Sequence, residues 1–570
     1  MENLTFSLTE NNDKALSTSG SACLDFFTRI TRNADMSDYL DSFCKAWQED
    51  KEMAFQILMN MRDVRTGKGE KLIPQVILVH LKFNLAPNVY EDVLRKMVEY
   101  GYWKDLLKVL EIYLRTNLLS NKKYKLTLCP IELQLFAEQL KIDSQILTDA
   151  EQTGDTKKAA ISLCAKWSPS EGTHFNHHPM LFAQAIYKEM GLSAKEYRLC
   201  VGKLRRHLNV LESLMSSQRF DEIDFSKLPS VAMMKMKKAF MRDSNSDGKE
   251  SDARKKLHLS YSKYLEDLTK GKTKVNIKGI QPHELVDTYL SGSSDIDLLV
   301  EAQWSALKMR VKESGAFRDV TAVVDVSSSM NGQPMQVAIS LGILVAECTD
   351  GPYHGQVITF HQNPSWHKLA GNNLKEQVDC MSAAPWGGST NMRGVFDLIL
   401  SQAQNANLTQ NEMVKTLFVF TDMQFNGGVT QNFESTFEYA KNNFESAGYK
   451  LPRIVCWNLR TSTAKTMPVQ KEEEGYVMLS GFSAELLKCI LTAKEFTPMA
   501  MLRHVLEPYL VPSSVKNCTT ALVAPLSIDN LKQGVKNSEL KKAFKSVKEK
   551  TTTTTNVSCE SCHNSDSDSD

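Results

Sequence analysis

The hydrophobic periodicity of this chain changes near residue 318, and no other feature of the sequence constrains the fold as strongly. From about 22 to 220, apolar residues recur at helical spacing and strand-like alternation is nearly absent. The clearest predicted helices span 51–62, 72–83, 88–98 and 103–116. Helices with short connections predict a bundle or an α-solenoid, and an irregular one, because no repeat of fixed period is found.

After residue 318 the pattern is that of strands alternating with helices. Residues 319–325, DVTAVVD, form an apolar run rich in β-branched side chains, which is typical of a buried strand. The other predicted strands are 356–360, 415–421, 453–458 and 476–480, and the predicted helices are about 334–349, 392–404, 431–447 and 483–493. This alternation predicts a mostly parallel sheet with helices on both faces. We therefore expect two parts, an α-helical domain over 21–300 and an α/β doubly wound domain over 315–515.

The composition is that of an ordinary globular protein. Of the 570 residues, 42% are hydrophobic and 24% are charged, and the formal net charge of +1 indicates no class of partner. No apolar run reaches the ~18–20 residues that span a bilayer, and the N-terminus lacks a secretory pattern. We predict a cytoplasmic protein without a membrane partner, and the nucleus stays open as an alternative. Residues 1–20 and the acidic tail 549–570 are expected to be disordered.

Polar side chains follow two of the predicted strands. Asp325, Ser327 and Ser329 come directly after the first strand, and Asp422 comes just past another apolar strand. Because ligands of open α/β sheets bind at the carboxyl ends of strands, we expect these side chains to lie close together. Thr390, in the Gly-rich loop WGGSTNMRG, adds a further hydroxyl. Carboxylate and hydroxyl oxygens are hard ligands, so these five residues predict a divalent-cation site for Mg²⁺ or Mn²⁺.

This pattern resembles the metal-ion-dependent adhesion site of von Willebrand A domains. In that family an Asp-x-Ser-x-Ser loop follows the first strand, a Thr comes from a second loop, and an Asp follows the fourth strand. All five positions are matched, by Asp325, Ser327, Ser329, Thr390 and Asp422. The resemblance implies a von Willebrand A-like fold over 315–515. Two carboxylates and three hydroxyls fall short of a closed octahedron, so we expect water or an acidic group of a protein partner to fill the remaining positions.

The rest of the chain resembles an uncharacterised domain-of-unknown-function family with the same two-part layout. The resemblance rests on the segments RDVRTGKGE (62–70), YGYWKDLL (100–107), AKWSPSEG (165–172), YRLCVGKLRRHLNVLE (197–212), FDEIDFSKLPSVAM (220–233) and PHELV (282–286). More remotely, the layout resembles TROVE-domain proteins, the Ro autoantigen and its relatives. In those proteins a ring of helical repeats is joined to a von Willebrand A-like domain and binds RNA. The first family implies no activity, and the second implies RNA as a partner.

A basic stretch lies in the second half of the helical region. Residues 227–278 hold 14 Lys or Arg and six Asp or Glu, a local net charge of +8. Such a stretch indicates contacts to RNA phosphates, and Arg198, Lys203, Arg205 and Arg206 lie just upstream of it. The candidates for these contacts are those four residues together with Lys235, Lys237 and Lys238. The interleaved Phe240, Tyr261 and Tyr264 could stack on unpaired bases. The alternative is a solvated helical surface with those aromatics in its core.

Three other motifs are weaker. The sequence TGKG at 66–69 lacks the first Gly and the Ser or Thr of a phosphate loop, and fits a turn between helices that carries a compact cluster of basic side chains. The histidines of THFNHHP lack a partnered Cys or carboxylate at metal-ligand spacing, which favours a surface loop. CESCH at 559–563 matches the haem-attachment pattern but lies in the acidic tail, which favours coincidence. We identify no catalytic residues.

The function predicted from the sequence is that of a non-enzymatic, metal-dependent binding protein that also binds RNA. The first alternative is a protein-interaction scaffold whose metal site docks a partner's Asp or Glu, without RNA. The second alternative is a metal-assisted phosphohydrolase. It ranks last because only two carboxylates are visible at the predicted site.

Overall fold

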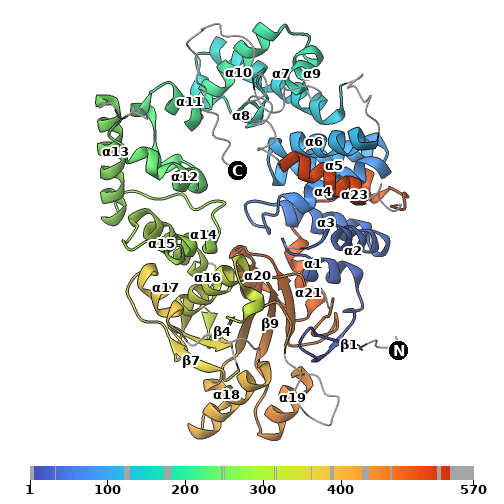
Figure 1. The fold of residues 1–570 in the computed structure, drawn as a ribbon, viewed down its shortest axis with the longest axis vertical. Helices are drawn as coiled ribbons and strands as arrows, with labels where there is room; N and C mark the ends of the chain where they lie inside the picture. The colour runs from blue at the N-terminus through green and yellow to red at the C-terminus, as the bar shows by residue number, and fades with distance from the viewer. Residues whose placement is uncertain are drawn as a thin grey trace, which may run out of the picture.

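The computed structural model describes residues 6–539 except for 33, 121–128, 173–180, 245–247, 249–250, 314, 316, 361, 385–390, 426–435, 463–464 and 523–527. Thr390, the histidines of THFNHHP and the tail 549–570 therefore lie outside the described residues. The chain has a helical N-terminal part and a C-terminal part built around a six-stranded sheet. In Figure 1 two arms of helices rise on either side of the sheet and meet opposite it, so that the ribbon closes into a ring.

The first arm contains the helices that the hydrophobic pattern predicts. Its helices are α1 (Ala22–Arg29), α2 (Met36–Glu49), α3 (Lys51–Arg62), α4 (Leu72–Asn84), α5 (Pro87–Tyr100) and α6 (Trp103–Ser120). The side chains of Ser21, Asp35 and Asp50 accept hydrogen bonds from the first backbone N–H groups of α1, α2 and α3. Because these donors have no partner within their own helix, such caps fix where a helix begins.

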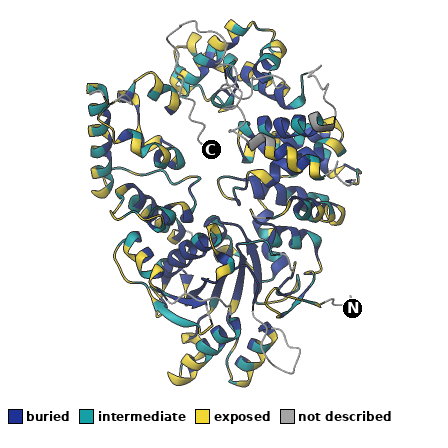
Figure 2. Ribbon diagram, in the orientation of Figure 1, coloured by how far each residue is buried: buried dark blue, intermediate teal, exposed yellow. Residues whose placement is uncertain are grey.

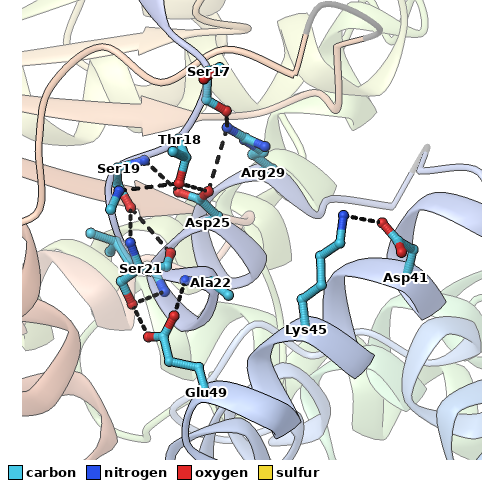
Figure 3. A network of polar contacts seen from close by, with 12 residues as sticks. Ser17, Thr18, Ser19, Ser21, Ala22, Asp25, Arg29, Asp41, Lys45 and Glu49 are labelled. Atoms are coloured by element: carbon cyan, nitrogen blue, oxygen red, sulfur yellow. Dashed lines mark hydrogen bonds and ion pairs between the residues drawn. The ribbon is translucent and has the colours of Figure 1, made fainter. Parts of the chain in front are cut away.

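Polar contacts at the start of α1 tie it to α2, as Figure 3 shows. The Ser21 hydroxyl donates to Glu49 Oε1 over 2.5 Å, and the same carboxylate accepts the backbone N–H of Ala22. Asp25 accepts the Thr18 hydroxyl at 2.7 Å and the Ser19 N–H at 2.9 Å. The chain therefore enters the helical arm in a fixed direction.

The remaining helices complete the ring. They are α7 (Ile131–Gln152), α8 (Cys164–Trp167), α9 (Phe182–Glu189), α10 (Ala194–His207), α11 (Leu211–Ser216), α12 (Ser230–Phe240), α13 (Asp252–Thr269), α14 (Pro282–Leu290) and α15 (Leu298–Lys312). Residues from 211 to 299 form a small hydrophobic cluster of their own around Phe225, Phe240 and Tyr261. The second arm thus has a local core in addition to the main one.

The C-terminal part contains the predicted sheet. Its strands are β4 (Val320–Asp325), β6 (Gln356–Phe360), β7 (Ser365–Lys368), β8 (Thr416–Thr421), β9 (Arg453–Asn458) and β10 (Tyr476–Ser480). The order is β10-β9-β8-β4-β6-β7, with every pair parallel except β6 and β7. Every residue of β4 is buried, which explains its continuous apolar run. Strands β3 (Phe317–Arg318) and β5 (Thr349–Asp350) form a separate short parallel pair. Along the chain, β3 comes just before β4 and β5 just before β6.

The helices of this part are α16 (Gln333–Cys348), α17 (Leu374–Ser382), α18 (Met392–Asn405), α19 (Thr436–Ser446) and α20 (Glu485–Thr492). A Cβ on Gly342 of α16 would lie 2.4 Å from Val324 Cγ2, so glycine lets α16 approach β4 closely. The sequence did not predict β7 or α17. The strand β7 is four residues long, and none of them is fully buried, so the apolar run that identifies the other strands is missing.

The N-terminus differs from the expectation of disorder over 1–20. Strands β1 (Phe6–Leu8) and β2 (Lys14–Leu16) form an antiparallel hairpin, and Leu16 also bridges to Met467. Two three-residue strands are too short to be stable alone. The hairpin forms because it packs on segments more than 400 residues away, which local sequence patterns do not reveal.

The end of the described chain returns to the helical arm. Helix α21 (Pro498–Leu506) packs on α1 and α3, α22 (Ser513–Lys516) packs on α3 and α5, and α23 (Ile528–Glu539) packs along α6. The main hydrophobic core is one cluster that joins both parts, with buried members from Leu16 to Val535 but none between Leu204 and Ile280. Figure 2 shows this buried band crossing from the sheet into the first arm.

Candidate metal centre

The predicted metal-binding residues that the structure describes come together at the carboxyl edge of the sheet. Asp325 ends β4, and Asp422 follows the neighbouring strand β8. The backbone N–H of Ser327 donates to Asp325 Oδ1 at 2.9 Å, which curls the loop after β4. The Ser327 and Ser329 hydroxyls lie 3.0 Å apart, and Ser329 is hydrogen-bonded to the Asp422 carboxylate. Four side chains from two strand ends thus share one small region.

Both carboxylates are removed from water. Asp325 is fully buried and Asp422 is 2% exposed. Burial and the nearby charge of Asp422 raise the pKa of Asp325 to about 7, against the hydrogen bonds from Thr421 and Ser327. Burial also raises the pKa of Asp422, although hydrogen bonds from Ser329 and Gln424 and the charge of Arg460 oppose it. Two desolvated acids side by side are costly without a cation, and a bound divalent ion would compensate them.

Sequence reasoning missed two residues of this region. Thr421, the last residue of β8, donates its hydroxyl to Asp325 Oδ2 at 2.6 Å. Arg460, just past β9, hydrogen-bonds to the carbonyl of Ser329, and its charge acts on Asp422. Their positions at the ends of neighbouring parallel strands were a usable signal, because such ends meet at one edge.

The donor set fits a hard cation that keeps several water ligands. In the described ranges no group of three or more His, Cys, Asp or Glu side chains is placed to hold a metal ion. The described protein ligands would be the carboxylates of Asp325 and Asp422 and the hydroxyls of Ser327 and Ser329. The fifth predicted ligand, Thr390, lies outside the described residues. Mg²⁺ is commonly bound in this way, by one or two carboxylates with water.

The basic residues of α10 are largely engaged with the protein. Arg205 is part-buried and donates to the carbonyls of Ala165 at 2.8 Å and Ser168 at 2.6 Å. Arg198 pairs with Glu171, and Lys203 pairs with Glu151 at 2.5 Å. Of the four predicted residues on this helix, Arg205 thus has a structural role, whereas Arg198, Lys203 and Arg206 remain exposed.

Comparison with known proteins places the chain in a family. A family model described as Domain of unknown function (DUF2828) matches residues 9–132 and 118–317, which is more than half of the chain. The chain belongs to the DUF2828 family. A second family model, described as Domain of unknown function (DUF7788), matches residues 319–528. The two matched segments meet where the hydrophobic period changes.

Two individual proteins are similar to this DUF2828 chain. Uncharacterized protein L728 of Acanthamoeba polyphaga mimivirus is 57% identical over 563 residues, covering 98% of this chain and 97% of the relative. The crystal structure of the Deinococcus radiodurans RO (RSR) protein matches at 13% identity and a TM-score of 0.38, covering 86% of this chain and 100% of that one. A score this low carries no argument about function.

The remaining candidates of the DUF2828 chain fall into two groups. On α12, Lys237 pairs with Asp297 at 2.5 Å, while Lys235 and Lys238 are exposed. The residues proposed to stack on bases are instead packed inside the second arm, because Phe240, Tyr261 and Tyr264 are all buried. Their alternative reading, that they are core, is confirmed.

The TGKG segment forms the predicted turn between α3 and α4, and of the four basic side chains around it only Arg65 and Lys71 are exposed. Lys68 is buried, and so is Arg62, whose Nε donates to Asp105 at 2.8 Å. Neither side chain is available to a phosphate. No helix in the described residues is long and apolar enough to cross a membrane.

Proposed function

We propose that this DUF2828 protein is a non-enzymatic binding protein whose C-terminal part holds Mg²⁺ or Mn²⁺ and binds an acidic group of a protein partner. The observation that carries the proposal is the convergence of Asp325, Ser327, Ser329 and Asp422 at one edge of the sheet. When bound, the metal would supply the positive charge that a partner carboxylate needs. The four side chains would hold the ion, and Arg460 would fix the loop that carries Ser329.

The chain order of the strands supports a von Willebrand A-like arrangement. Within the six-stranded sheet, β4 is the first strand along the chain and β8 is the fourth. Asp325 therefore follows the first strand and Asp422 the fourth, as the metal-ion-dependent adhesion site requires. In the sequence, Thr390 falls between Ser329 and Asp422, which is the order of the adhesion-site pattern.

Calorimetry on the full-length chain tests the metal site directly. We expect saturable Mn²⁺ binding by the wild type and loss of that binding in Asp325→Ala, because the substitution removes one of two carboxylates. Asp350→Ala is the matched control, since Asp350 is an exposed acid on β5. Circular dichroism on each variant verifies folding. Equal Mn²⁺ affinity in the wild type and Asp325→Ala would refute the site.

RNA binding is the second candidate function, and one observation favours it. Arg206, Lys235 and Lys238 expose their side chains, as do Lys256 and Lys263 on α13. If they contact phosphates, log K should fall linearly with log salt, by about 0.7 per neutralised phosphate on a single strand. Charge reversal at Lys235 and Lys238 should flatten the slope, and Asp325→Ala should leave it intact. Absence of saturable binding by the wild type in low-salt filter binding would end this candidate.

A further inference from the structure

The turn of the N-terminal hairpin lies on the loop that follows β8. The Thr9 hydroxyl donates to the carbonyl of Phe425 at 2.8 Å, and the Glu10 N–H donates to Gln424 Oε1 at 2.7 Å. Asn11 Nδ2 donates to the carbonyl of Gln424 at 2.6 Å. Gln424 is only two residues past Asp422, so these bonds hold residues 9–11 beside the candidate metal centre.

The same turn also reaches the loop that follows β9. The Ser462 hydroxyl donates to Glu10 Oε1 at 3.1 Å. Ser462 is two residues past Arg460, which contacts the Ser329 carbonyl. Glu10 thus joins two loops that each contribute a residue to the candidate metal centre.

The charge of Glu10 acts on that centre. Its side chain accepts the Ser462 hydroxyl, two residues past Arg460, and its backbone N–H donates to Gln424, two residues past Asp422. A divalent cation at Asp325 and Asp422 would cancel their two negative charges and leave the positive charge of Arg460, so that the local field would attract Glu10. An exposed carboxylate at the tip of this hairpin is able to respond, because each hydrogen bond between the tip and the loop after β8 is worth only about 0.5–1.5 kcal/mol, whereas Leu16 anchors the base of the hairpin to Met467.

We propose that Glu10 is an internal acidic group that the bound metal attracts, so that the hairpin guards the metal centre and an external carboxylate must compete with it. The inference rests on the proposed function. It makes the hairpin a strap over the binding site: metal binding tightens it, and a partner's Asp or Glu displaces it. The covering turn comes from residues 9–11 and the site from residues between 325 and 422.

Hydrogen exchange of the full-length protein, measured by mass spectrometry over residues 6–16, tests the strap. We expect Mn²⁺ to slow exchange of this segment severalfold in the wild type and not in Glu10→Gln, which keeps the shape of the side chain and loses its charge. Acetate, as the carboxylate probe, should reverse the protection. Glu472→Gln is the matched control, because Glu472 is exposed in the loop before β10, at the amino end of that strand.

The outcomes separate the strap from the metal site. Asp325-dependent Mn²⁺ binding, with slower hairpin exchange that is lost in Glu10→Gln and kept in Glu472→Gln, supports both. Asp325-dependent binding with unchanged or faster hairpin exchange overturns the role of Glu10 alone. If Mn²⁺ slows hairpin exchange in Glu10→Gln as much as in the wild type, the role of Glu10 is also overturned. Mn²⁺ binding that is absent, or indifferent to Asp325→Ala, overturns the metal site and the strap with it.

Discussion

Lys68 shows how much a single side chain can depend on its surroundings. It lies in the turn between α3 and α4, yet its Nζ reaches the carbonyl of Phe27 at 2.5 Å and Ser480 Oγ, at the end of β10, at 2.7 Å. It also lies 4.0 Å from the centre of the Phe27 ring. Lysine is almost never fully buried unless it is paired. This one connects the first arm to the sheet.

The buried position of Lys68 predicts a pH-dependent stability. Burial lowers its pKa to about 7, against the charge of Glu70, while in the unfolded chain it titrates near its ordinary value. Between these two values the unfolded state binds more protons, so this contribution to stability rises with pH from about 7 to 10. Lys68→Met lacks the contribution. Its melting temperature should therefore fall relative to the wild type as pH rises from 7 to 9.

Thermal scans at pH 7, 8 and 9 measure this difference, because other titrating groups are common to both proteins. Lost hydrogen bonds to Phe27 and Ser480 shift the variant by a constant amount and leave the slope alone. Lys157→Met, at an exposed lysine, should follow the wild type at each pH. A Lys68→Met curve parallel to the wild type would mean that Lys68 remains charged in the folded protein.

Sequence reasoning was strong for residues whose role follows from strand position. Asp325 and Asp422 could be placed together because each follows an apolar run, and parallel strand ends share an edge. It was weak for basic residues. Nothing near Arg205 in the sequence reveals the Ala165 carbonyl that it meets in the fold, 40 residues away, and nothing near Lys237 reveals the Asp297 carboxylate, 60 residues away.

At the scale of elements, the periodic helices and buried strands were predictable, and the elements that depend on distant partners were not. The β1–β2 hairpin and α23 belong to the second kind. Helix α23 packs along α6, more than 400 residues earlier in the chain. A Cβ on Gly534 of α23 would lie 2.3 Å from Thr116 Oγ1 and 3.3 Å from the carbonyl of Ile112. Close packing of the two helices thus requires glycine there.

Gly534→Ala should therefore loosen α23. Overpacking of a tight contact costs roughly 1–3 kcal/mol, which exceeds the gain of up to ~1 kcal/mol from replacing a helical glycine. We expect a lower melting temperature and faster hydrogen exchange in α6 and α23. Gly202→Ala on α10 is the matched control, because a Cβ there meets no atom within 4 Å. That variant should be unchanged or stabilised, and equal behaviour of the two variants would contradict close packing at Gly534.

At the scale of the whole molecule, the two parts share one hydrophobic core. The change of period near residue 318 predicted two parts, and the helical and sheet-containing parts are confirmed. What periodicity could not show is that α1 packs on β10, or that α21 packs on α3. These contacts join segments far apart in sequence, whereas a hydrophobic pattern reports only which face of an element is buried.

A shared core predicts that the halves need each other. Expressed separately, residues 1–318 and 319–570 should each expose a large apolar surface and aggregate. Coexpressed with a tag on one half, they should copurify and elute at the size of the intact protein in gel filtration. Lys68→Glu should weaken this association, and Lys157→Glu should not. Two halves that are monomeric and folded on their own would show that the shared core is dispensable.

The shared core also limits which recombinants of such chains would fold. A recombination event near residue 318 between two diverged members of the family would exchange whole matched segments and leave each reading frame intact. The resulting hybrid would nevertheless carry a Lys68 turn from one ancestor and a Ser480 strand from the other. Every contact across the junction would then have to fit by chance. We expect the two segments to share one phylogeny, and the relative that aligns along 98% of this chain carries both of them.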